Sequence, residues 1–264
     1  MRRSLTPFLL FVLAVPALAA DESAPKPNLV AIVTDDQARW AMGAYGNAEI
    51  RTPNMDRIGR EGALFMNAFV VTPVCSPSRA AYMSGRWPTE VGITDYLSPQ
   101  ESDAGIGLSA PIWPEVLQQN GYRTALLGKW HLGTKPQFHP KRKGFDHFFG
   151  FVGGGNRPID PLLEVDGQET QLEGPLPDLL VDDAIGFIRR SQRDKTPFLL
   201  CLHFRAPHTP YLPVPEQDSA PYADLDPTVP LEPGVVPEEI KDSHRAYYAS
   251  VTSVDRNIGR LLDA

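Results

Sequence analysis

Three continuous apolar runs constrain the fold of this chain more than any other feature of its sequence. They cover residues 28–34, 122–127 and 198–204, and the first is rich in β-branched side chains. Such runs are typical of strands that are covered on both faces. Segments with apolar residues at helical spacing alternate with them, at residues 52–62, 77–85, 113–119, 179–190 and 243–262. This alternation predicts an α/β fold with a doubly wound, mainly parallel sheet sandwiched by helices.

The first 20 residues have the layout of a secretory signal peptide. Arg2 and Arg3 form a short basic region, residues 5–15 are mostly apolar, and Ala17-Leu18-Ala19 offers the small residues of a cleavage site. The apolar stretch is shorter than the about 20 residues that a membrane span needs, and proline interrupts it. We therefore expect cleavage near residue 20 and export to the periplasm or the extracellular space, without a stable membrane anchor.

The remaining chain, about 245 residues long, suffices for one large domain with a substantial core. The full sequence has a net charge of −7 and lacks a dense cluster of Lys and Arg, which argues against a surface that binds nucleic acid. The sequence has two cysteines, Cys75 and Cys201. Cys201 lies inside an apolar run and is interpreted as a small core residue, with a Cys75–Cys201 disulfide as the alternative.

Two long segments rich in glycine and proline, residues 150–177 and 206–237, do not fit regular elements. Long irregular segments inside a compact domain often form the walls or lids of an active site. The alternative is that they are surface insertions without a function.

Two adjacent carboxylates, Asp35 and Asp36, follow the first predicted strand directly. In open α/β sheets, ligands bind outside the carboxyl ends of the strands. Oxygen ligands suit a hard cation, with Ca²⁺ as the first choice and Mg²⁺ as the second. The alternative is that one of the two aspartates only caps the following turn.

The pentapeptide Cys75-Ser76-Pro77-Ser78-Arg79 begins another predicted helix, since proline suits a first helical turn. Backbone amides at such a terminus favour anions, including a tetrahedral sulfate. Arg79, about one turn further on, can hold an oxyanion with its forked donors. As an unmodified thiol, Cys75 would instead be a nucleophile with His131 or His203 as its base, or an inert buried residue.

Polar side chains also follow the other two predicted strands. Lys129 and His131 lie two residues apart in extended chain, where they can share a face and neutralise an oxyanion. His208 follows the third strand and could act as a general acid towards a leaving alcohol oxygen. His203 lies within that strand and is interpreted as a packed, hydrogen-bonded core histidine.

The Cys-x-Pro-Ser-Arg motif, the opening Pro27-Asn28-Leu29-Val30 and the block at residues 128–133 resemble the N-terminal catalytic part of the type I sulfatases. These enzymes belong to the alkaline-phosphatase-like superfamily. The resemblance covers almost everything from Pro27 onward and implies one catalytic domain over residues 26–264. In this family a formylglycine-generating, or sulfatase-maturating, enzyme oxidises the motif cysteine to Cα-formylglycine.

The resemblance also implies how the candidate residues would act on an aryl or carbohydrate sulfate ester. Asp35, Asp36 and the modified Cys75 would bind Ca²⁺. The sulfate would be surrounded by Arg79, Lys129, His131 and His208. One hydroxyl of the aldehyde hydrate would attack sulfur and expel the alcohol, and the second would then collapse to the aldehyde and release sulfate.

The sequence departs from the family pattern near Ala264. The family takes further calcium ligands from a later strand that ends in Asp, then Asn or His, then Gly, and it adds a smaller C-terminal subdomain. Asp255 does not replace that strand, because it lies within a helical stripe, so we expect an incomplete metal site and an unpaired sheet edge. Three hypotheses follow: a sulfatase truncated here, a related enzyme acting on phosphonates or phosphodiesters, and a non-catalytic remnant that binds sugar sulfates.

Overall fold

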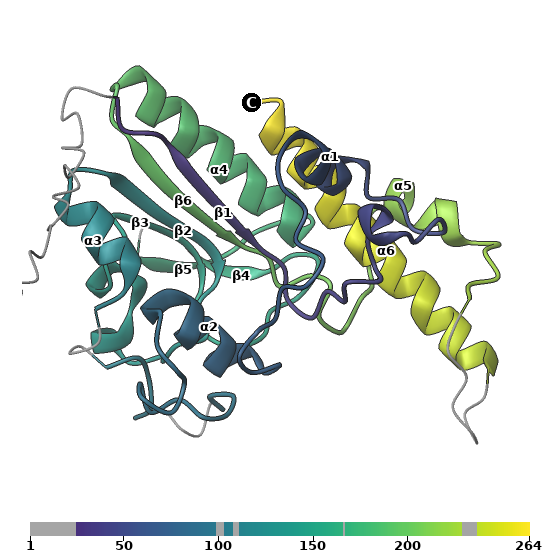
Figure 1. The fold of residues 1–264 in the computed structure, drawn as a ribbon, viewed down its shortest axis with the longest axis horizontal. Helices are drawn as coiled ribbons and strands as arrows, with labels where there is room; N and C mark the ends of the chain where they lie inside the picture. The colour runs from purple at the N-terminus through teal and green to yellow at the C-terminus, as the bar shows by residue number, and fades with distance from the viewer. Residues whose placement is uncertain (1–24, 99–102, 108–110, 166, 229–236) are drawn as a thin grey trace, which may run out of the picture.

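A six-stranded sheet forms the centre of the protein (Figure 1). The structure, a computed structural model, describes residues 25–98, 103–107, 111–165, 167–228 and 237–264, so the predicted signal peptide lies outside the described residues. The strand order is β1-β6-β2-β3-β4-β5. The strands are β1 (Leu29–Val33), β2 (Arg123–Lys129), β3 (His147–Phe151), β4 (Leu162–Val165), β5 (Gln168–Gln171) and β6 (Phe198–His203).

The sheet is mixed but mainly parallel, which confirms the predicted α/β class. Strands β1, β6, β2 and β3 run parallel to one another, while β4 and β5 add an antiparallel hairpin at the far edge. The register pairs His203 with Val33 on one side and with Gly128 on the other. The carboxyl ends of β1, β6 and β2 therefore meet at one edge, and the residues after these strands start from neighbouring positions.

Helices cover both faces of the sheet (Figure 1). Leu127 of β2 packs in an apolar cluster with residues of the two longest helices, whereas its neighbour Leu126 packs in a second cluster with α2. This alternation is the period of a strand that is buried on both faces. The helices are α1 (Pro53–Glu61), α2 (Cys75–Ser84), α3 (Trp113–Gln119), α4 (Leu176–Arg193), α5 (Glu216–Ser219) and α6 (Pro237–Leu262).

Two expectations about the strands were wrong. The segment 150–177 was expected to be irregular, yet it contains β4 and β5, which pair through a hairpin with Gly167 in the left-handed region at φ 80°. Both strands are short, and β5 consists of polar residues, so they lack the apolar run by which β1, β2 and β6 were found. Strand β3 was not predicted either.

Strand β1 was expected to be covered on both faces, but it lies at the edge of the sheet. Within the described residues β6 is its one partner, and Leu29 and Val30 remain 37% and 46% exposed.

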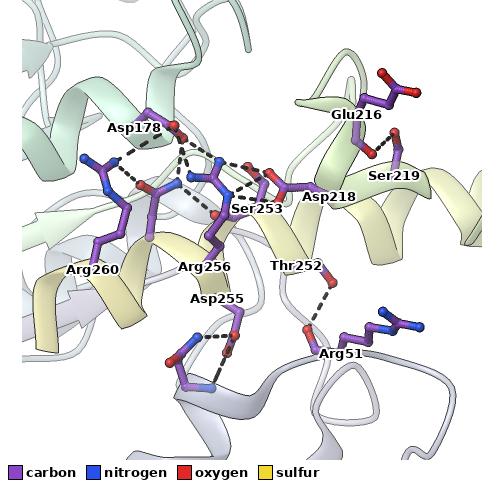
Figure 2. A network of polar contacts seen from close by, with 12 residues as sticks. Arg51, Asp178, Glu216, Asp218, Ser219, Thr252, Ser253, Asp255, Arg256 and Arg260 are labelled. Atoms are coloured by element: carbon purple, nitrogen blue, oxygen red, sulfur yellow. Dashed lines mark hydrogen bonds and ion pairs between the residues drawn. The ribbon is translucent and has the colours of Figure 1, made fainter. Parts of the chain in front are cut away.

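Helix α6 connects several parts of the fold through polar contacts (Figure 2). Arg256 forms ion pairs with Asp178 of α4 and Asp218 of α5. The carboxylate of Asp255 accepts hydrogen bonds from the backbone N–H groups of Asn54 and Met55, in the first turn of α1. A side chain from α6 thus satisfies amides that a local N-cap residue would otherwise bind.

Thr52 does occupy the predicted N-cap position of α1, but its hydroxyl does not cap the helix. It accepts a hydrogen bond from the backbone N–H of Gly43 and donates one to Asp56. Among the helices that the structure describes, we find no segment with the length and apolar character needed to cross a membrane.

Candidate functional site

Four of the residues predicted from the sequence line one pocket at the carboxyl edge of the sheet. Asp35 and Asp36 come from the turn after β1, and Cys75 and Arg79 come from the first turns of α2. The pocket has a volume of about 270 Å³. Residues that are about 40 positions apart in the sequence therefore meet because β1 and α2 end and begin at the same edge.

Asp35 is the buried centre of an ionic cluster. Its Oδ2 lies 2.5 Å from Nζ of Lys129 and 3.4 Å from Nη2 of Arg79. Burial alone would raise the pKa of Asp35, but the charges of Arg79 and Lys129 outweigh it and hold that pKa below its ordinary value. The carboxylate is thus ionised and faces two cations.

The guanidinium of Arg79 is held from three sides. Besides Asp35, it donates to the backbone oxygen of Lys129 at 3.0 Å, and its Nη1 lies 3.2 Å from Nδ1 of His203. Burial lowers the pKa of Arg79, an effect that Asp35 opposes, and arginine keeps its charge in proteins. Nδ1 of His203 also lies 3.3 Å from the backbone oxygen of Lys129, so it faces both a donor and an acceptor. Burial, followed by the charge of Arg79, lowers the pKa of His203 to about 3, so the ring is neutral at pH 7.

Cys75 is the first residue of α2, two positions before Pro77, so the helix begins slightly earlier than predicted. The preceding Val74 is extended and supplies no side-chain cap. Neither Cys75 nor the fully buried Cys201 is in a disulfide, as the favoured reading of the sequence expected. The Cys75 side chain thus stands at a helix N-terminus, where the amides favour a negative charge.

Asp36 lies beside Asp35 in a different environment. Its side chain is 62% exposed, and its backbone is in the left-handed region at φ 60°, which is uncommon for a residue other than glycine. The hydroxyl of Tyr247 donates to the backbone oxygen of Asp36 at 2.9 Å and accepts from the N–H of Ala38 at 2.8 Å. Nε2 of His208 lies 3.6 Å from the Asp36 carboxylate, although His208 itself does not line the pocket.

Lys129, His131 and His208 are the three predicted site residues that do not line the pocket. Lys129 is fully buried behind Asp35. His131 is in the left-handed region at φ 59°, and its Nε2 donates to the backbone oxygen of Leu97 at 3.0 Å. Burial, followed by the charge of Lys129, lowers the pKa of His131 to about 4, so the ring is neutral at pH 7.

The carboxylates of the pocket do not make a complete metal site. Among the described residues, no three acidic, histidine or cysteine side chains converge on one point. Asp35 and Asp36 have the oxygen chemistry that Ca²⁺ prefers, but Ca²⁺ takes six to eight oxygens. Asp35 is also already paired with two cations.

Comparison with known proteins agrees with this geometry. The model of the sulfatase family matches residues 27–264. The chain belongs to the sulfatase family. This places it in the alkaline-phosphatase-like superfamily, as the sequence motifs indicated.

The sulfatase is similar over most of its length to curated relatives and solved structures. It is 37% identical over 213 residues to an N-acetylglucosamine-6-O-sulfatase of Bacteroides thetaiotaomicron. The aligned residues cover 80% of this chain and 36% of the relative. It is 32% identical to an ulvan-active sulfatase of Formosa agariphila, over 90% of this chain and 46% of the relative.

Among solved structures, that of Ps i-CgsB in complex with k-i-k-neocarrahexaose matches with a TM-score of 0.81 and 32% identity. The match covers 90% of this chain and 54% of the solved one. The sulfatase thus spans about half the length of the relatives it matches, or less.

Sequence reasoning missed two contacts of this sulfatase's site. His203 is the packed core histidine that was expected, but it also contacts Arg79. Tyr247 was expected only as part of an apolar stripe, yet it holds the turn at Asp36 from a helix more than 200 residues away. The position of His203 within a predicted strand indicated packing but not its contact with Arg79, and nothing near Tyr247 in the sequence indicated the contact of that side chain.

Proposed function

We propose that this sulfatase hydrolyses carbohydrate sulfate esters, with Cys75 in its oxidised, Cα-formylglycine form. The observation that carries the proposal is the position of Cys75 at the N-terminus of α2, in one pocket with Arg79 and the two aspartates. The helix terminus and the arginine favour a tetrahedral oxyanion at this point. The names of the relatives point to sugar sulfates as the class of substrate.

The modified Cys75 would supply a hydrated aldehyde whose hydroxyl attacks the sulfur atom. Arg79 would bind sulfate oxygens with the guanidinium edge that Asp35, His203 and the backbone leave available. A rigid guanidinium does not need to reorganise as charge moves in the transition state. A maturating enzyme of the formylglycine-generating class would be a required partner in the cell.

His208 would donate a proton to the alcohol oxygen as it leaves. Its Nε2 lies 3.6 Å from the carboxylate of Asp36, which lines the pocket and would orient the ring. Lys129, which lies behind Asp35, would compensate the negative charge of the Asp35 carboxylate. His131 would contribute as a neutral ring, because its lowered pKa keeps it uncharged at pH 7.

Ca²⁺ would be the cation at Asp35, Asp36 and the modified Cys75, with Mg²⁺ as the second choice. The two carboxylates supply fewer oxygens than Ca²⁺ takes, so further ligands are needed for tight binding. The predicted signal peptide favours export to the periplasm or the extracellular space. The enzyme would act there on sulfated carbohydrates.

The proposal is tested by producing the chain together with a maturating enzyme. The Cys75 peptide should then be lighter by about 18 Da, the difference between a thiol and an aldehyde side chain. The matured protein should release sulfate from 4-nitrophenyl sulfate in the presence of Ca²⁺. The variant Cys75→Ala should lose this activity, whereas Cys201→Ala, at the buried cysteine outside the pocket, should keep it.

Two results would overturn the proposal. Faster hydrolysis of a 4-nitrophenyl phosphonate or phosphodiester than of the sulfate would assign the site to phosphorus esters. A Cys75 that remains a thiol after co-expression, in a protein that still binds sugar sulfates, would identify a binding protein instead.

A further inference from the structure

A second groove lies beside the pocket, on the segment that leads from β1 towards α1. Its volume is about 560 Å³, and its lining includes Trp40, Asn47, Glu49, His244 and Tyr248. It therefore combines aromatic rings with a carboxylate and an amide, which is the usual make-up of a site for a small polar molecule.

Trp40 is the largest apolar side chain of the groove and is 49% exposed. Its ring stacks on His244, with a centroid distance of 5.4 Å and an interplanar angle of 22°. The ring centroid of Tyr247 lies 5.5 Å from that of Trp40. Nδ2 of Asn47 donates to the backbone oxygen of Trp40 at 2.9 Å. The indole is thus supported from behind and beside by α6 while about half of it faces solvent, so a ligand can bind to it without first ordering it.

Glu49 sets the charge of the groove. Its carboxylate accepts hydrogen bonds from the backbone and hydroxyl of Thr228 and from the hydroxyl of Tyr248. These donors are neutral, so the negative charge remains in the groove. A sulfate group at this position would meet a like charge, whereas neutral hydroxyl groups could donate to the carboxylate.

The groove adjoins the proposed active site through Tyr247. This side chain packs against Trp40 and also hydrogen bonds the backbone of Asp36. Trp40 lies four positions after Asp36, a span of at most about 14 Å of extended chain. An oligosaccharide can bridge such a distance, so one sugar unit can occupy the pocket while another lies in the groove.

We propose that the Trp40 groove binds a neutral pyranose ring of the carbohydrate whose sulfated unit occupies the pocket. A pyranose has apolar faces, which suit the exposed indole, and hydroxyl groups around its edge, which suit Glu49. The inference rests on the proposed function and adds to it that the substrate is an oligosaccharide or polysaccharide with an unsulfated unit near the sulfated one.

The test measures binding and turnover separately, with the full chain. Hexasaccharides from carrageenan, ulvan and chondroitin sulfate are titrated by saturation-transfer NMR against the parent protein, Trp40→Ala, Trp40→Phe and Trp87→Ala. Trp87 is the matched control, because it is 62% exposed and lies outside the groove. Near-ultraviolet circular dichroism checks that each variant is folded.

At least one hexasaccharide should bind the parent protein, and Trp40→Ala should weaken its affinity about fivefold to tenfold. Trp40→Phe should retain part of the affinity, and Trp87→Ala should retain all of it. The inference is wrong if none of the hexasaccharides binds, or if Trp40→Ala and Trp87→Ala bind equally well.

Hydrolysis of 4-nitrophenyl sulfate separates this inference from the proposed function, because that ester is too small to reach the groove. Turnover of the aryl ester without Trp40-dependent sugar binding would leave the function intact and overturn the groove. Trp40-dependent binding by a matured protein that hydrolyses no sulfate ester would support the groove and overturn the proposed function.

Discussion

Nζ of Lys129 lies 2.5 Å from Oδ2 of Asp35, and both side chains are buried at the carboxyl edge of the sheet. Lys129 ends β2, while Asp35 follows β1, and β6 lies between these two strands. Removing one member of a buried ion pair leaves the other charge without its partner, which costs more than the pair itself contributes.

We therefore expect Lys129→Met to lower the free energy of unfolding by about 3 kcal/mol. Urea unfolding of the parent and the variant measures this difference. The double variant Lys129→Met with Asp35→Asn should not recover the loss, because it leaves the buried guanidinium of Arg79, which also pairs with Asp35, without a carboxylate. Lys135→Met, at an exposed ion pair with Asp103, is the control and should change stability little. Equal losses for the buried and the exposed lysine would contradict this account.

The second prediction concerns Tyr247, whose hydroxyl contacts the backbone on both sides of the left-handed turn at Asp36. Tyr247→Phe removes both hydrogen bonds and keeps the ring, so it should cost about 1 kcal/mol of stability. The N–H of Ala38 should exchange with deuterium faster, since it loses its acceptor.

Hydrogen exchange followed by mass spectrometry locates that effect. Tyr45→Phe is a suitable control, because the Tyr45 hydroxyl makes an exposed hydrogen bond to the backbone of Phe65. Unchanged exchange at Ala38 in Tyr247→Phe would show that the hydroxyl does not hold the turn.

A third prediction follows from the contact between α6 and the start of α1. Asp255→Ala leaves the backbone N–H groups of Asn54 and Met55 without their acceptor, so we expect a loss of about 1–2 kcal/mol in the free energy of unfolding. Asp255→Asn should cost less, because its amide oxygen can still accept. Asp263→Ala, at an exposed side chain near the end of α6, serves as the control. Stability that is the same in Asp255→Ala and Asp263→Ala would rule out the capping role.

The strands predicted from the sequence, β1, β2 and β6, each contain a continuous apolar run, whereas the short β3 was missed. Strands β2 and β6 are buried on both faces, so their sequences carry a continuous signal. The hairpin of β4 and β5 lies at the far edge of the sheet and needs few apolar side chains, which is why Gln168–Gln171 gave no signal. The edge position of β1 was also hidden, because its composition is that of a central strand.

The site was predictable where residues follow strands or begin a helix. Asp35, Asp36, Cys75 and Arg79 meet because parallel strands bring their carboxyl ends together. The contacts that hold these residues were not predictable, since Tyr247 and His203 reach the site through tertiary packing. A single sequence carries no signal for a contact between positions 36 and 247.

The last prediction is a loss of stability in mild acid that comes from two buried histidines. Burial, then the charge of a neighbouring cation, lowers the pKa of His131 to about 4 and that of His203 to about 3, from an ordinary value of 6.5. Between pH 6.5 and 4 these two positions bind protons in the unfolded chain but not in the folded protein, so the histidines make stability fall as the pH falls. Asp255, whose pKa is raised by burial, acts in the opposite sense. Each histidine contributes up to about 1.4 kcal/mol per pH unit. The lowered pKa of Asp35 acts below its ordinary value of 3.8, outside this window.

Urea unfolding at pH 7, 6 and 5 measures the slope of the free energy of unfolding against pH. His203→Asn, whose amide oxygen can still accept from Arg79, should make the slope shallower, whereas Ser191→Ala, at a buried side chain without charge, should leave it unchanged. A slope that His203→Asn does not alter would mean that His203 takes up protons equally in both states.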